Sequence, residues 1–155
     1  MVIGLGNPIL GDDGVGWCVA KEVKHLIDPD LPVDVDYLSL GGISLMEHLI
    51  GYECIILVDA YFSEEEFGTI KVSRLDEIPD YSAFHITSAH DTSLLNAMKL
   101  GKDLGAQLPD DVMVVGISAK HVYDFSEELS SPVAEAIPKA TQIVLDLIMQ
   151  KITIH

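Results

Sequence analysis

A glycine-rich junction near the amino terminus reads Gly4-Leu5-Gly6-Asn7-Pro8-Ile9-Leu10-Gly11-Asp12-Asp13-Gly14-Val15-Gly16. An apolar strand leads into this junction, and an amphipathic helix leads out of it. Glycines permit backbone torsions that other residues avoid, and they let a ligand or another backbone approach closely. The two aspartates stand where a strand passes into a helix, which is where open α/β sheets place their binding sites.

The composition is that of a single globular domain, residues 1–155, because 48% of the 155 residues are hydrophobic. Nine Lys and Arg stand against 25 Asp and Glu, a formal net charge of −16. Such a charge repels phosphate backbones, so we expect no nucleic acid partner. No apolar run reaches membrane-spanning length, and no basic signal region precedes the first strand. We therefore expect a cytoplasmic protein without a membrane partner, in which Cys18 and Cys54 are reduced core thiols.

Hydrophobic periodicity predicts five strands and four helices. The strands are expected over residues 1–6, 33–40, 54–58, 68–75 and 112–117, and the helices over 14–27, 44–50, 89–104 and 132–152. Ser88 is the expected N-cap of the third helix, and Pro138 should bend the last one. Only about eight residues separate the third and fourth strands, too few for a parallel crossover, so the fourth strand should be antiparallel. We predict a single-domain α/β three-layer sandwich, with a five-stranded mostly parallel sheet, one antiparallel strand, and helices on both faces.

Three possible metal ligands converge at the carboxyl edge of the predicted sheet. Asp13 follows the first strand, Asp59 follows the third, and His90 lies in the first turn of the helix predicted over 89–104. Each has an ordinary structural explanation alone, as a cap, a turn former or a solvated histidine, but their joint placement favours a site. Two carboxylates and one imidazole leave coordination positions open for substrate or water. His121 is the only other histidine expected at this edge.

The two neighbouring aspartates should have different roles, because consecutive side chains at a helix entry point in different directions. We expect Asp13 to face the crevice as a ligand and Asp12 to cap N–H groups of the first helix. Replacing Asp12 by alanine would then cost about 1 kcal/mol, the usual loss of a cap.

Other motifs fit the junction poorly. A dinucleotide fingerprint needs a third glycine where Ile9 stands, and no acidic residue ends the second strand. Gly4-Leu5-Gly6-Asn7-Pro8 is similar to the start of peptidyl-tRNA hydrolases, but Gly-Asp-Asp-Gly follows in place of that family's Thr-Arg-His-Asn, and the acidic charge opposes tRNA. The chain contains neither the H-E-x-x-H zinc protease motif nor the G-x-S-x-G elbow of serine hydrolases.

The junction from Gly6 to Gly16 resembles the opening motif of the nickel–iron hydrogenase maturation endopeptidases. Further matches to that family follow in order: Gly41-Gly42, Leu57-Val58-Asp59-Ala60, Ser88-Ala89-His90-Asp91 and Pro132-Val133-Ala134-Glu135-Ala136. Members of the family bind a metal through an acidic residue of the opening loop, an aspartate at a strand end and a histidine before a helix. The resemblance assigns these roles to Asp13, Asp59 and His90.

The resemblance implies an endopeptidase that removes the C-terminal extension of a hydrogenase large-subunit precursor after nickel insertion. Nickel would arrive with the precursor, Asp13, Asp59 and His90 would complete its coordination, and another divalent cation could substitute for it. Either a metal-bound water or one of the aspartates could carry out the hydrolysis. The alternative function is a noncatalytic nickel-binding or chaperone-like module in hydrogenase assembly.

Overall fold

A five-stranded sheet forms the centre of the molecule in the computed structural model, which describes residues 1–78, 93–120 and 125–154. The strands are β1 (Val2–Leu5), β2 (Val35–Leu38), β3 (Cys54–Phe62), β4 (Ile70–Arg74) and β5 (Asp111–Ala119). The helices are α1 (Val15–Leu26), α2 (Gly42–His48), α3 (Leu94–Asp103) and α4 (Ser131–Ile154), with 3-10 turns η1 (Gly11–Gly14) and η2 (Leu75–Glu77).

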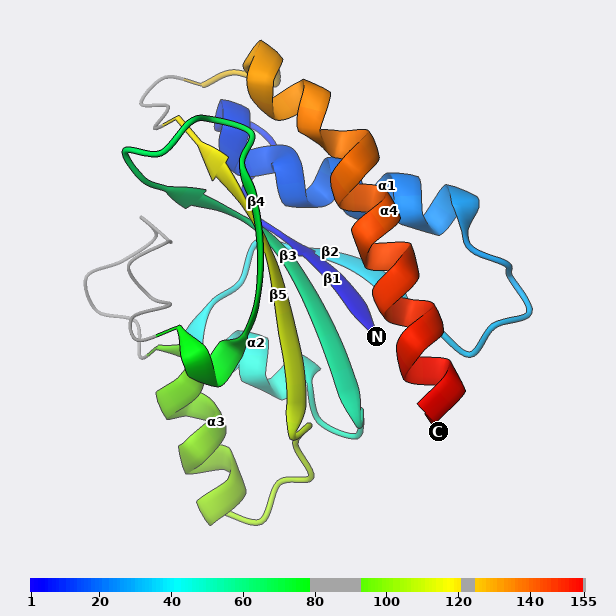
Figure 1. Ribbon diagram of the computed structural model, residues 1–155. Helices are drawn as coiled ribbons and strands as arrows, with labels where there is room; N and C mark the ends of the chain where they lie inside the picture. Colours follow the sequence, from blue (N-terminus) through cyan, green and yellow to red (C-terminus); the bar gives the residue numbers. More distant parts are fainter. Residues whose placement is uncertain (79–92, 121–124, 155) are drawn as a thin grey trace.

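The strand order is β2-β1-β3-β5-β4, and only β4 runs antiparallel to its neighbour within the described sheet. Helices α1 and α4 cover one face, and α2 and α3 cover the other (Figure 1). The predicted α/β sandwich, with one antiparallel strand after a short connection, is therefore confirmed. Within the described residues, no helix is both long and apolar enough to cross a membrane.

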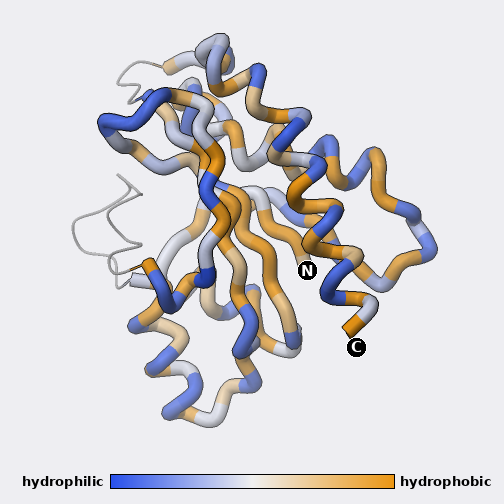
Figure 2. The backbone as a smooth tube through the Cα atoms, viewed as in Figure 1, coloured by the Kyte–Doolittle hydropathy of each residue, from blue (hydrophilic) through white to orange (hydrophobic). Residues whose placement is uncertain are grey.

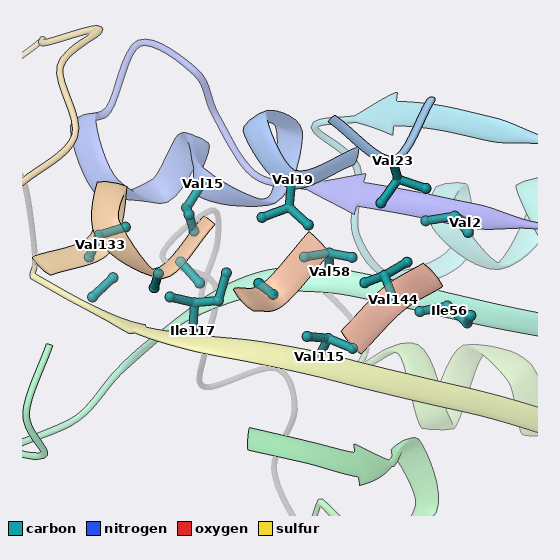
Figure 3. Close-up of a cluster of buried hydrophobic side chains, with 14 of the residues drawn as sticks. Val2, Val15, Val19, Val23, Ile56, Val58, Val115, Ile117, Val133 and Val144 are labelled. Carbon is teal, nitrogen blue, oxygen red and sulfur yellow. The ribbon is translucent and has the colours of Figure 1, made fainter. Parts of the chain in front are cut away.

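Each face of the sheet has its own apolar core, because successive side chains of a strand point to opposite faces. Figure 3 shows the core under α1 and α4, where Val58 and Val115 from the sheet meet Val19 and Val144 from the helices. Leu57 belongs to the core under α2 and α3. The central strands are therefore apolar on both faces, whereas the helices alternate between apolar and polar positions (Figure 2).

The structure corrects two predicted boundaries. Strand β3 does not end at Val58 but continues to Phe62, because β5 also continues and pairs residue by residue as far as Phe62↔Ala119. Helix α3 begins at Leu94 rather than at residue 89, and Ser93 is its N-cap, where its Oγ accepts a hydrogen bond from the Asn96 N–H at 3.3 Å. The predicted cap, Ser88, lies outside the described residues.

The two cysteines are free, as predicted, but each is only partly buried rather than in the core. Burial raises the pKa of the Cys18 thiol and, together with the nearby Asp111 carboxylate, that of Cys54. A raised pKa disfavours the reactive thiolate. Neither cysteine therefore has the electrostatic surroundings of a nucleophile.

Candidate active site

Two glycines bring the junction into direct contact with the ends of two strands. A Cβ on Gly16 would lie 2.3 Å from the Leu5 carbonyl oxygen and 2.4 Å from that of Val58, so α1 begins directly against β1 and β3. Gly6 has φ +132°, and a Cβ there would lie 1.9 Å from the Asp13 carbonyl oxygen. Only glycine fits either position, and the close approach places η1 over the carboxyl end of β1.

Asp13 lies in η1, directly above that strand end. Its Oδ2 accepts a hydrogen bond from the Asn7 N–H at 2.8 Å. The Asn7 side chain in turn accepts from the Ile9 N–H at 3.2 Å. The partly buried carboxylate of Asp13 is thus held against the backbone of the loop that leaves β1.

Asp59 lies inside β3, whereas the sequence analysis placed it after the strand. Gly4 pairs with Val58, so Asp59 is level with Leu5, the last residue of β1. The side chain of Asp59 is only 2% exposed and follows Leu57 on the face covered by α2 and α3. Because η1 packs against β3, the structure brings both Asp13 and Asp59 to the point where β1 ends.

The third predicted ligand, His90, lies outside the described residues, as does His121. His90 precedes α3 rather than belonging to its first turn, because that helix begins at Leu94. Within residues 1–78, 93–120 and 125–154, no three His, Cys, Asp or Glu side chains are grouped so that they could hold a metal ion. The set of Asp13, Asp59 and His90 therefore stays a prediction.

Asp12 does not cap the first helix, which corrects the expected role. Neither η1 nor α1 receives a side-chain cap, and Asp12 is 1% exposed. Its Oδ1 accepts from the Ser130 N–H at 2.6 Å, and its Oδ2 accepts from the Ser130 hydroxyl at 2.8 Å and the Lys120 N–H at 3.1 Å. Asp12 therefore joins the junction to the end of β5 and the start of α4.

A cavity of about 300 Å³ adjoins Asp59, and the sequence analysis missed it. Asp59 and Lys71 both pair with Gly116, so they lie level with each other on one face with a glycine between them. The Tyr61 hydroxyl donates to Glu65 at 3.0 Å, and burial together with this bond raises the pKa of Tyr61 to about 12. Glu65 also forms an ion pair with Lys71.

The cavity places a phenol, an ammonium group and carboxylates beside Asp59. The one sequence signal for it was Gly116, a glycine inside an otherwise apolar strand, which indicates a close approach. A Cβ at this position would lie 2.9 Å from the Tyr61 ring.

A family model described as hydrogenase maturation protease matches residues 19–147 of the chain. The chain belongs to the hydrogenase maturation protease family. A putative hydrogenase maturation protease of Methanocaldococcus jannaschii is 32% identical to this protease over 149 residues, which cover 94% of this chain and 93% of that protein. The resemblance inferred from the sequence is thereby confirmed.

Solved structures agree with this assignment. The hydrogenase 2 maturation peptidase from Thaumarchaeota archaeon SCGC_AB-539-E09 is 31% identical, with a TM-score of 0.69 over 95% of this chain and 96% of that one. The hydrogenase maturating endopeptidase HybD from E. coli shares the fold with a TM-score of 0.78 at 23% identity, over 97% and 91% of the two chains. The matched family region contains Asp59 but begins after Asp13, so the placement of Asp13 rests on the geometry of the junction.

Proposed function

We propose that this protease removes the C-terminal extension of a nickel–iron hydrogenase large-subunit precursor after nickel has been inserted. Family membership supports the hydrolysis. The observation that supports the more specific proposal is that Asp13 and Asp59 belong to two segments, η1 and β3, that both lie at the carboxyl end of β1.

The nickel ion belongs to the substrate in this proposal, and Asp13, Asp59 and His90 complete its coordination. Carboxylate oxygens and an imidazole nitrogen suit a divalent ion of this kind. Asp59 is 2% exposed, and a divalent cation is one kind of partner that a buried carboxylate can bind. Another divalent cation with similar ligand preferences could take the place of nickel.

A bound divalent ion would polarise the scissile carbonyl and lower the pKa of an attacking water. Residues of the chain itself orient the two carboxylates. The Asn7 N–H fixes the direction of the Asp13 carboxylate, and the rigid sheet fixes that of Asp59. If the water is not metal-activated, one of the two aspartates acts as the general base in this proposal.

Recognition through substrate-borne nickel requires weak binding of free nickel and tight binding only in the loaded precursor. Three protein donors leave positions that the precursor or water can fill. The rates of cleavage of nickel-loaded and metal-free precursor should therefore differ strongly. Equal rates would show that nickel is not the recognition signal.

Incubation of the purified protease with nickel-loaded precursor, followed by mass spectrometry, tests the function itself. A shortened precursor means hydrolysis, whereas an unchanged mass favours the noncatalytic nickel-binding or chaperone-like module. Asp13→Asn and Asp59→Asn should abolish most cleavage, because a neutral amide oxygen is a poorer ligand for a divalent ion. Asp30→Asn, a change at an exposed position between α1 and β2, is the matched control and should cleave at the wild-type rate.

A further inference from the structure

The cavity of about 300 Å³ beside Asp59 lies over β3, β5 and β4, on one face of the sheet. Asp59 lines it from β3. Val114 of β5 and Ser73 of β4 also line it, and these two residues pair directly across their strands. Val114 belongs to the core under α2 and α3, so the floor of the cavity continues the surface of that core.

Most of the cavity wall is apolar. Val114 is 4% exposed and Tyr61 is 7% exposed, and the partly buried Ile78 packs against the same core. Gly116 contributes no side chain, which makes room for the Tyr61 ring: a Cβ on Gly116 would lie 2.9 Å from this ring. The cavity therefore offers an incoming group a valine, an isoleucine and the face or edge of a phenol ring.

The charged groups of the cavity are already engaged with other residues of the chain. Glu65 accepts the hydrogen bond of the Tyr61 hydroxyl at 3.0 Å and forms an ion pair with Lys71. The Lys71 ammonium group also lies 5.6 Å from the centre of the Tyr61 ring. Glu77 accepts the Arg74 N–H at 3.2 Å. A charged newcomer would have to exchange these contacts for its own, whereas an apolar side chain leaves them intact.

The position of the cavity relates its occupant to whatever is bound at Asp59. Asp59 pairs with Gly116, so Val114 lies one strand away and two residues lower. Strands are about 4.8 Å apart and rise about 3.3 Å per residue, which places the floor of the cavity roughly 8 Å from Asp59. An extended polypeptide held at Asp59 spans that distance in about three residues.

We propose that the cavity beside Asp59 is a specificity subsite, which takes one apolar side chain of the precursor within about three residues of the scissile bond. This inference rests on the proposed function. The occupant belongs to the molecule that is cut, because Asp59 itself lines the cavity. Val114 and Ser73 determine the specificity, since they face the occupant from two strands. Tyr61 is a positioning residue, held in place over Gly116 by its bond to Glu65.

Substitutions in the nickel-loaded precursor locate the side chain. Mass spectrometry of the product gives the cut, and each of the three residues on either side is changed in turn to alanine, leucine and phenylalanine. At one position leucine should exceed alanine in kcat/KM by about tenfold, the usual effect of a few buried methylene groups. The other positions should show no such preference.

Two pairs of protease variants then change the size of the cavity. Val114→Ala deepens it, and Val115→Ala is the matched control, because the next side chain of β5 packs in the core on the opposite face. Ser73→Leu fills it, and the control Val72→Leu changes an exposed side chain on that opposite face. Val114→Ala should shift the preference from leucine toward phenylalanine by about threefold or more, and Ser73→Leu should abolish the preference for leucine over alanine. Both controls should keep the wild-type preference.

The inference is overturned if Ser73→Leu keeps the wild-type preference, or if Val115→Ala shifts it as much as Val114→Ala does. A preference for lysine or arginine over leucine that disappears in Glu77→Gln would also overturn it, since the cavity would then bind a cation. If the wild-type protease leaves the precursor uncut, the proposed function fails. The cavity is then judged by equilibrium binding of the unmodified precursor, which Ser73→Leu should weaken and Val72→Leu should not; equal weakening refutes the subsite.

Discussion

Replacement of Asp12 by alanine should destabilise the protease far more than the loss of a helix cap would. The carboxylate is 1% exposed and accepts three hydrogen bonds, two from backbone N–H groups and one from a hydroxyl. Hydrogen bonds to a charged group contribute roughly 1.5–3 kcal/mol each, and buried donors left without an acceptor cost about 1–3 kcal/mol. The two energies cannot simply be added, because the Ser130 hydroxyl can turn toward water once the carboxylate is gone.

The expected loss in the free energy of unfolding is therefore on the order of 3–5 kcal/mol, against about 1 kcal/mol for a cap. At about 2–4 °C per kcal/mol for a chain of this length, the melting temperature should fall by roughly 6–20 °C. A typical stability of about 5–15 kcal/mol equals or exceeds this loss, so the loss is measurable as a shift of the unfolding transition.

Urea denaturation followed by far-UV circular dichroism measures this loss, with Asp30→Ala as the exposed control. Asp12→Asn is the second variant. The asparagine amide keeps one acceptor oxygen but turns an NH₂ group toward the hydrogen-bond donors. The free energy of unfolding of Asp12→Asn should therefore also fall by several kcal/mol. A loss of 1 kcal/mol or less in Asp12→Ala, equal to that of the control, would refute the reasoning that Asp12 anchors the connection to α4.

Two further predictions concern stability. Gly16→Ala should lower the free energy of unfolding by about 1–3 kcal/mol, because the added Cβ would meet two backbone carbonyl oxygens. This loss is expected although alanine is the better helix former. An unchanged urea midpoint would contradict the close packing of α1 on β1 and β3. Burial acts to raise the pKa of Asp111, but the Lys151 ammonium group, with smaller contributions from the Cys54 thiol and the Arg74 guanidinium, lowers that pKa below its usual 3.8. A carboxyl group whose pKa is lower in the folded state than in the unfolded state stabilises the folded protein at pH values above its unfolded-state pKa. This stabilisation is lost as the pH falls through the folded-state pKa. Wild type and Lys151→Met should therefore differ in urea midpoint at pH 7 and converge near pH 2, and a constant difference would contradict the ion pair.

The architecture could be predicted because it depends on local signals. Periodicity located every described helix and strand, and the short connection after β3 required β4 to be antiparallel. The end of β3 was misplaced because the prediction followed the apolar run, which stops at Val58. Pairing with β5 carries the strand on through Asp59 to Phe62, where one face is already polar. Because β3 stays buried through Tyr61, the end of the apolar run marks neither the end of the strand nor the end of its coverage.

The start of α3 and the role of Asp12 show two different limits of a single sequence. Ser88 and Ser93 are equally good caps by residue type, and the structure identifies Ser93 because its Oγ meets the Asn96 N–H. The hydrogen bonds of Asp12 reach Lys120 and Ser130, which lie 108 and 118 residues away. Only tertiary packing brings such partners together, so no local pattern could have indicated them.

The adjacent aspartates are mechanically coupled, and this coupling determines how their variants must be interpreted. Asp12 faces the interior and holds the connection to α4, while Asp13 holds the loop after β1 through the Asn7 N–H. Both belong to the four-residue turn η1, whose close contact with Gly6 leaves no room for independent movement.

Loss of cleavage in an Asp12 variant would not by itself make Asp12 a ligand, since a displaced turn also displaces Asp13. The diagnostic result is the combination: Asp13→Asn should lose cleavage with little loss of stability, whereas Asp12→Ala should lose stability first and cleavage in proportion. If Asp12→Ala stayed fully stable yet inactive while Asp13→Asn remained active, the ligand assignment would have to move by one residue.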